Sequence, residues 1–111
     1  MRGGTMYEQK EIILIPFSDL TGTKQRPAII ISNSKINKTE DRICCLVTSN
    51  KSQDVIPINN DDFKEGVLPF KSYIKPHRIF TVNKKIIRKK LCAINVRLHK
   101  KLIEEINKLI D

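Results

Sequence analysis

The chain has 111 residues and a formal net charge of +9, from 21 lysines and arginines against 12 aspartates and glutamates. This length suits one domain, and the positive charge favours a polyanionic partner, although lysines that only keep the surface soluble would give the same excess. No stretch approaches the about 18 apolar residues of a membrane span, and the N-terminus lacks the apolar stretch of a signal peptide, which predicts a cytoplasmic protein without membrane contact.

Short strands are predicted along most of the chain, because apolar β-branched runs alternate with turn-forming residues. The expected strands are Glu11–Phe17, Arg26–Ser32, Arg42–Ser49, Val55–Ile58, Tyr73–Asn83 and Leu91–Ile94. Residues 73–83 could also form two short strands around Pro76. The segments Ser18–Gln25, Asn33–Asp41 and Asn59–Ser72 are expected to be loops. Pro57 indicates an edge strand, since proline cannot donate to a sheet ladder. The spacing of the strands is typical of a small antiparallel barrel, in the mainly β (α+β) class.

The end of the chain changes to a helical period. Asn83 is a candidate N-cap, and the basic run Lys84–Lys90 is expected to form one or two helical turns. We interpret this run as a solvated face with Ile86 and Ile87 directed inward, in preference to an RNA track. Apolar residues on one face predict a helix over residues 96–110.

No repeat or linker divides the chain, so residues 1–111 are predicted to form a single domain. Residues 1–8 are interpreted as a mobile arm or an expression remnant. The three cysteines, Cys44, Cys45 and Cys92, have no C-x-x-C spacing and no nearby pair of histidines. They are therefore predicted to be buried thiols in a reducing compartment, with Cys44 and Cys45 on opposite faces of one strand. Neither a metal site nor a cofactor is predicted.

Three stretches, taken in order, make the chain resemble the MazF/PemK family of toxin endoribonucleases. They are "IILIPFSDLTGTKQRPAIIIS", "CLVTSN" and "GVLPFKSYIKPHRIFTVNKKII". The resemblance implies an SH3-like β-barrel that forms a homodimer and cleaves single-stranded RNA, usually mRNA, at short sequences in a groove across the dimer. It also implies a partner, an antitoxin whose acidic C-terminal segment occupies the same groove.

The resemblance assigns catalysis to Arg26 and Thr48. Metal-free cleavage uses the 2′-OH of the substrate as nucleophile, so the site must stabilise charge on the phosphorane and move two protons. The planar guanidinium of Arg26 suits the phosphate, and Pro27 sets the backbone at the start of the strand. Thr48 is expected to orient the reacting groups through its hydroxyl. The alternatives are a strand-edge Arg26 that pairs with Asp19 or Asp41, and a Thr48 that only ends its strand.

The proton carrier is less well defined by the resemblance. Relatives place an arginine and an acid near the positions of Lys75 and His77, or a Glu-Gln pair at His77 and Arg78, and this chain has neither pattern. Histidine is the side chain that suits proton transfer near neutral pH, so His77 is a candidate acid or base, with a plain surface histidine as the alternative. Lys75 and Arg78 are predicted to contact RNA.

Further RNA contacts are expected around the first loop. Gly22 gives that loop mobility, Lys24 and Gln25 could meet phosphates and base edges, and Phe17 could stack on a base or belong to the core. The remaining candidates are Ser49, which could also be structural, and Ser72, which could also end a loop.

Two other functions share parts of this pattern. A gyrase-poisoning toxin of the CcdB type has a related fold, but its action depends on C-terminal residues, commonly a tryptophan. This chain has no tryptophan and ends in "NKLID". A non-catalytic nucleic-acid-binding barrel is the second alternative, because the acid and base are not both identified.

Overall fold

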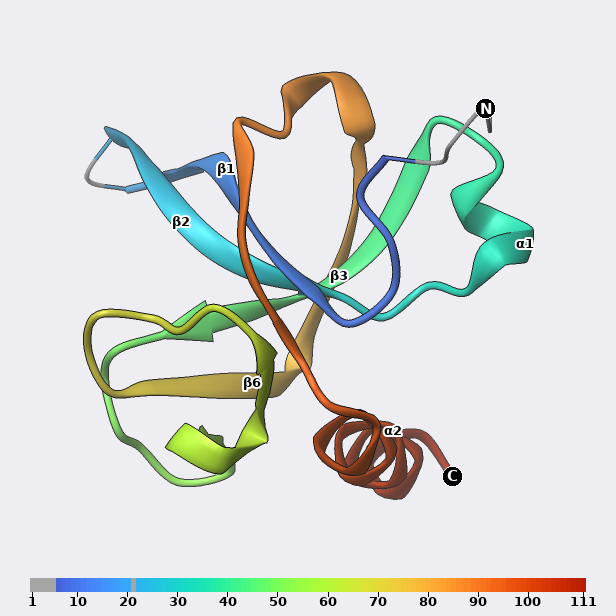
Figure 1. Cartoon of the computed structure of the whole chain (residues 1–111). Coiled ribbons are helices and arrows are strands. Elements are labelled where there is room, and N and C mark those ends of the chain that lie inside the picture. Colours follow the sequence, from blue (N-terminus) through green and yellow to red (C-terminus); the bar gives the residue numbers. More distant parts are fainter. Residues whose placement is uncertain (1–5, 21) are drawn as a thin grey trace.

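The computed structural model describes residues 6–20 and 22–111. The elements, shown in Figure 1, are in chain order β1 (Glu11–Asp19), β2 (Gly22–Ile30), α1 (Ser34–Asn37), β3 (Asp41–Thr48), β4 (Ile56–Ile58), η1 (Asn60–Asp62), β5 (Phe63–Glu65), β6 (Ser72–Asn83), η2 (Lys84–Ile86), β7 (Lys89–Ile94) and α2 (Val96–Ile110). The elements η1 and η2 are short 3₁₀ helices. The first five residues of the predicted arm lie outside the described part of the chain.

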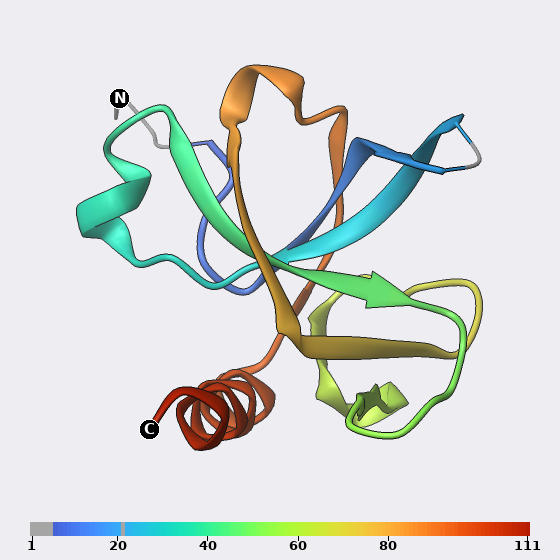
Figure 2. The ribbon, with the colours of Figure 1, turned by 180° about the vertical axis from the view of Figure 1, so that it is seen from behind.

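One antiparallel sheet holds all seven strands, in the order β4-β6-β3-β2-β1-β7-β5. The sheet bends into a nearly closed barrel whose two edge strands are β4 and β5. Seen from behind, α2 lies at the lower end of the molecule and η2 at the opposite end (Figure 2). The predicted small antiparallel barrel with a C-terminal helix is confirmed.

Both faces of the bent sheet bury side chains, in two separate clusters. The cluster that contains Cys45 packs against α2, and the cluster that contains Cys44 packs against Ile87, next to η2. Neighbouring residues of a strand point to opposite faces, so the predicted placement of the two cysteines is confirmed. Burial raises the pKa of each of these two thiols to about 12, and Cys92 is buried as well. The three free thiols therefore act as small apolar groups of the core.

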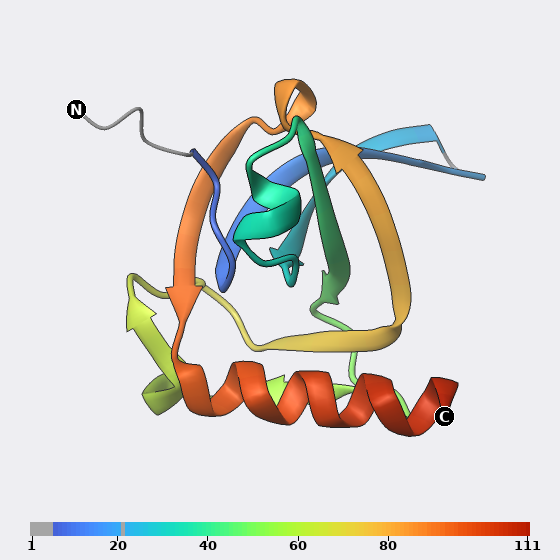
Figure 3. The same ribbon diagram turned by 90° about the vertical axis from the view of Figure 1, so that its right-hand side faces the viewer.

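The helix α2 has the bounds that its apolar period predicts. Its N-terminus is capped by Asn95, whose side-chain oxygen accepts a hydrogen bond of 2.9 Å from the backbone N–H of Leu98. Leu98, Leu102 and Ile106 are buried one turn apart, and Figure 3 shows the helix lying along the lower end of the barrel, below part of β6. The apolar face of α2 therefore closes this end of the core.

All three predicted loops contain more regular structure than expected, and one of them, Asn33–Asp41, contains the helix α1. The loop Ser18–Gln25 is wrong in extent, because β1 and β2 continue as a paired hairpin as far as Asp19 and Gly22. The loop Asn59–Ser72 contains η1 and β5, and β5 pairs with β7. Neither of the last two segments has a strong β-pattern of its own, so these strands depend on the neighbour with which they pair.

Arg42 is fully buried and fastens the N-terminal segment to the barrel. Its Nε and one terminal nitrogen donate to the carbonyl oxygens of Tyr7 and Met6, each at 2.7 Å. The other terminal nitrogen donates to the carbonyl oxygens of Thr39 and Asp41, at 2.8 Å and 2.7 Å. Because a buried guanidinium must use its donors, this arrangement anchors the described end of the predicted arm.

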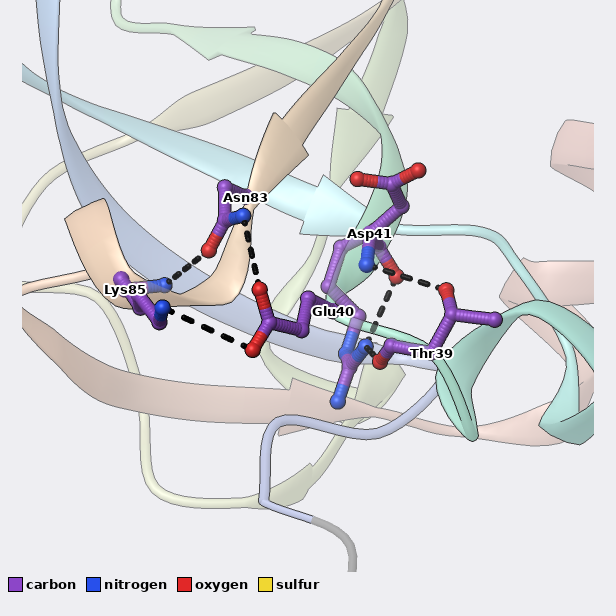
Figure 4. A network of polar contacts seen from close by, with 6 residues as sticks. Thr39, Glu40, Asp41, Asn83 and Lys85 are labelled. Carbon is purple, nitrogen blue, oxygen red and sulfur yellow. Dashed lines mark hydrogen bonds and ion pairs between the residues drawn. The ribbon is translucent and has the colours of Figure 1, made fainter.

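The basic run begins with a polar network that joins η2 to the start of β3 (Figure 4). The side-chain oxygen of Asn83 accepts from the backbone N–H of Lys85 at 2.9 Å, which confirms the predicted cap. The amide of Asn83 donates to the Glu40 carboxylate at 3.3 Å, and the Lys85 ammonium lies 3.6 Å from the same carboxylate. The hydrogen bond from Asn83, and then the charge of Lys85, lower the pKa of Glu40.

The rest of the basic run is divided between paired and exposed side chains. The Lys90 ammonium lies 2.8 Å from the Glu65 carboxylate and 3.4 Å from that of Glu11. Ile87 is 7% exposed, as the interpretation of a solvated face requires, but Ile86 is 42% exposed and that part of the expectation is wrong. Ile86 belongs to a 3₁₀ turn, which cannot direct two successive side chains to the same side.

Candidate active site

The sheet divides at the place where the candidate catalytic residues lie. Strands β2 and β3 pair at Ile30–Cys44, Ile29–Cys45 and Ala28–Leu46, and beyond the last pair they diverge, β2 with β1 and β3 with β6 (Figure 1). Arg26 lies two residues from Ala28 on one branch, and Thr48 lies two residues from Leu46 on the other. Because side chains alternate along a strand, Arg26 and Thr48 share the face of the sheet on which Ala28 and Leu46 lie.

Arg26 is held by the β1–β2 hairpin. It is half-buried opposite Ile15, a fully buried core residue, and Pro27 follows it opposite Leu14. Pro27 lies one residue beyond the last pair with β3, so its missing N–H costs no bond to that strand. The proline therefore stands where β2 loses its neighbour, next to the arginine that it positions.

Thr48 is the last residue of β3, and its hydroxyl forms a hydrogen bond within the same segment of the chain. It is half-buried opposite Tyr73 of β6, and its Oγ1 accepts a hydrogen bond of 3.1 Å from the backbone N–H of Asn50. This contact is typical of a turn, as expected from the alternative in which Thr48 only ends its strand. A hydroxyl that accepts from a backbone N–H still has its own hydrogen to donate, so the turn leaves Thr48 able to contact a phosphate oxygen. Ser49 follows as an exposed residue.

A bulge in β6 presents the other candidates. Cys45 pairs with Ile79 and the next residue, Leu46, pairs with Lys75, so residues 76–78 have no counterpart on β3. Within this bulge Pro76 is buried, while His77 and Arg78 are exposed. A bulge redirects the side chains that it carries, and this one lies beside the pair at which β3 and β2 separate.

Phe17 packs against two residues of other strands. Its ring centroid lies 5.8 Å from that of Phe80, in a tilted arrangement, and the guanidinium carbon of Arg78 lies 5.8 Å from the same centroid. Phe17 also borders the buried cluster of Cys44. The alternative in which Phe17 belongs to the core therefore describes its packing. Its cation–π contact with Arg78 links the β1–β2 hairpin to the bulge in β6.

The remaining candidates are spread over three places. Gly22, Lys24 and Gln25 are exposed on the hairpin, and Gly22 has a φ of +120° that suits glycine. Lys75 is half-buried on the face shared by Leu46. Ser72 is 2% exposed, and its hydroxyl donates to the carbonyl oxygen of Phe70 at 3.1 Å, so it shapes a loop.

Two further residues belong to this region and are not indicated by the sequence patterns. Tyr73 faces Thr48, and Phe80 supports Phe17. Because the bulge at residues 76–78 interrupts the alternation of side chains along β6, a period of two in the sequence does not place both residues on the same face. The sequence signal for this irregularity is Pro76, around which two short strands were the alternative to one, since proline within a strand is confined to edges and bulges.

Positive side chains predominate around these residues. Lys24 and Arg26 lie on β2, and Lys75 and Arg78 lie on β6. None of the ion pairs found between described residues joins Lys24, Lys75 or Arg78 to a carboxylate. Such a group of cations, with an exposed arginine among them, suits an anionic polymer.

In the part of the chain that the structure describes, no helix is long and apolar enough to cross a membrane.

Comparisons with known proteins agree with this architecture. Residues 8–110 match the profile of a family described as PemK-like, MazF-like toxin of type II toxin-antitoxin system. A sequence search among curated proteins found no match.

Three solved structures show the same fold at low sequence identity. An endoribonuclease in complex with its cognate antitoxin from Mycobacterial species superposes with a TM-score of 0.75 at 18% identity, over 93% of each chain. MazE-MazF (Form-II) from Deinococcus radiodurans gives a TM-score of 0.75 at 15% identity, over 93% of this chain and 94% of that chain. The Mycobacterium tuberculosis toxin MazF-mt6 gives 0.73 at 13% identity, over 91% of this chain and 96% of that chain.

Proposed function

The chain belongs to the PemK-like, MazF-like toxins of type II toxin-antitoxin systems, and we propose that it is an endoribonuclease that cleaves single-stranded RNA. The observation that carries this proposal is the position of Arg26 and Thr48, on one face of the sheet where β2 and β3 diverge. The solved structures that share the fold include proteins described as endoribonucleases, which supports the same reaction class.

The proposed reaction is attack by the 2′-oxygen of the RNA on the adjacent phosphorus. The bond from phosphorus to the 5′-oxygen breaks, which leaves a 2′,3′-cyclic phosphate and a 5′-hydroxyl. Arg26 stabilises the negative charge of the phosphorane through its planar donors, and the Thr48 hydroxyl donates to a phosphate oxygen. His77, exposed on the bulge, is the candidate for one of the two proton transfers, either from the 2′-OH or to the leaving oxygen.

We further propose that the substrate is mRNA cut at a short sequence in the cytoplasm, without a metal ion. The RNA would bind across a homodimer, where Phe17, Lys24, Gln25, Lys75 and Arg78 are the contacts that the cationic surface supports. An antitoxin is the proposed protein partner, because MazE-MazF complexes occur among the structures with this fold.

The test is cleavage of a long, mostly unstructured RNA in EDTA by the wild type and by Arg26→Ala, with the ends of the products mapped. The proposal expects cuts at a short recurring sequence, made only by the wild type, with 2′,3′-cyclic phosphate and 5′-hydroxyl ends. Binding without cuts would support a non-catalytic barrel. Neither binding nor cuts would favour a protein target, as in the gyrase-poisoning toxins.

A further inference from the structure

A cavity of about 620 Å³ lies where the barrel fails to close. The edge strands β4 and β5 stand at opposite ends of the strand order, and the cavity is lined by residues of both and by the segment that leads into β6. The lining residues that matter for its chemistry are Lys51, Asn60, Phe63, Phe70, Lys71 and Tyr73. Its volume is within the range of sites that hold small ligands or parts of larger ones.

The cavity adjoins the candidate active site through one strand pair. Tyr73, which lines the cavity, faces Thr48 across the β3–β6 ladder. Opposed residues of an antiparallel pair have Cβ atoms about 5 Å apart. A ligand in the cavity is therefore close enough to belong to the same RNA strand as a phosphate at Thr48.

The loop that forms one wall is fixed to its neighbours at both ends although it exposes an aromatic ring. Gly66 has a φ of +69°, and a Cβ built there would lie 3.2 Å from the Cβ of Cys92, so this glycine lets the loop pack closely on β7. At the other end of the loop, the buried hydroxyl of Ser72 donates to the carbonyl oxygen of Phe70. Phe70 nevertheless leaves 52% of its surface exposed. The hydrogen bond holds the backbone that carries this ring, and a ring that is left uncovered suits stacking on a planar group.

The charge of the lining favours an anion. Two lysines, Lys51 and Lys71, border the cavity, and no aspartate or glutamate is among the described residues that line it. Asn59 and Asn60 add amide groups, which can donate and accept hydrogen bonds at the edge of a base.

The opening between the edge strands β4 and β5 is here called the seam, and a peptide strand fits it less well than a nucleotide does. Pro57, at the centre of the three-residue strand β4, has no N–H to give to an added strand. The two edge strands are also short, so they offer few backbone groups for pairing.

We propose that this seam cavity binds one base of the RNA strand next to the cleaved phosphate, with Phe70 stacked on the base and Lys71 near a phosphate. This inference rests on the proposed ribonuclease function. It assigns the cavity a part in the sequence specificity of cleavage, because a base held between an aromatic ring and amide groups can be distinguished from other bases.

The experiment uses a short RNA that carries the mapped cleavage site, together with versions that have a single abasic ribose at each position near the cut. Cleavage rates are measured for the wild type, for Phe70→Ala and for the control Val67→Ala, which changes an exposed residue of the same loop outside the cavity. For one flanking position, removal of the base should slow the wild type by roughly ten- to a hundred-fold, the range expected for one stacked base. The same removal should change the Phe70→Ala rate by less than about two-fold, and Val67→Ala should behave as the wild type.

Equal sensitivity of the wild type and Phe70→Ala at every position would overturn the cavity proposal while leaving the ribonuclease intact. If the wild type cut no RNA, the proposed function would fail, and the cavity would be judged by binding of a fluorescent single-stranded RNA pool. Weaker binding by Phe70→Ala than by Val67→Ala would then still support the cavity. Equal binding by both variants, or no binding at all, would overturn it.

Discussion

Ala28 of β2 faces Leu46 of β3 in the pair at which the two strands separate. This pair determines the candidate active site, because Arg26 and Thr48 each lie two residues beyond it on the same face of the sheet. The two residues are 22 positions apart in the chain, and the local sequence around either one contains no information about the other. Their common position is a consequence of strand register, which a shift of one residue would destroy.

Replacement of Arg26 by lysine tests whether geometry or charge alone matters. We expect Arg26→Lys to slow cleavage by about a hundred-fold or more, because lysine cannot give two parallel hydrogen bonds to a phosphate. The matched control is Arg97→Lys, on the exposed side of α2, where the arginine lies 3.6 Å from the Asp62 carboxylate. Single-turnover cleavage rates would be compared, and similar rates for the two variants would remove Arg26 from the mechanism.

The role of Thr48 depends on its hydroxyl, so Thr48→Val and Thr48→Ser should differ. Thr48→Val keeps the shape but loses the hydroxyl, and we expect its rate to fall by at least ten-fold with little change in RNA affinity. Thr48→Ser keeps the donor and the bond from Asn50, and it should retain most of the activity. A serine variant as slow as the valine variant would mean that packing, rather than the hydroxyl, is what matters.

The two histidines of the chain act as controls for each other in the pH dependence of cleavage. If exposed His77 transfers a proton, His77→Gln should remove one limb of the pH–rate profile between about pH 5 and 8. His99→Gln should leave the shape of that profile unchanged. An unaltered profile in His77→Gln would assign the proton transfer to another group.

His99 should instead affect stability at acid pH. Its Nδ1 is buried and finds no hydrogen-bond partner among the residues that the structure describes, and burial, followed by the charge of Lys10, lowers its pKa. Because the unfolded chain binds the proton more tightly, the folded state loses stability as the pH falls below about 6.5.

Urea unfolding at pH 7 and pH 5 measures this effect. The loss of stability on acidification should be smaller in His99→Gln than in the wild type, while His77→Gln should retain the full loss. Equal losses in all three proteins would show that His99 does not contribute to the acid sensitivity.

Gly66 should be required for the loop beside the seam cavity. Gly66→Ala places a side chain in the left-handed region and against Cys92, which we expect to cost about 1–2 kcal/mol of unfolding free energy. Denaturant unfolding measures the loss, with Lys64→Ala, at an exposed position of β5, as the control. A neutral Gly66→Ala would indicate that the loop adopts another conformation.

The elements that were predicted correctly are those whose burial follows a short period. The helix Val96–Ile110 agrees with its expected bounds because Leu98, Leu102 and Ile106 repeat at helical spacing and Asn95 caps the first turn. Cys44 and Cys45 were assigned to opposite faces by strand alternation alone. In both cases the deciding interaction lies within a few residues along the chain.

The tertiary structure alone decided where the chain pairs and where it stays open. The extension of the β1–β2 hairpin to Gly22, the strand β5 and the burial of Arg42 all depend on partners distant in sequence. The resemblance named Arg26 and Thr48, but only strand register places them on one face, and only the unpaired edges of β4 and β5 create the seam cavity. Local patterns record which side of an element is buried, whereas register and closure arise from contacts between elements, and a period along one strand cannot encode them.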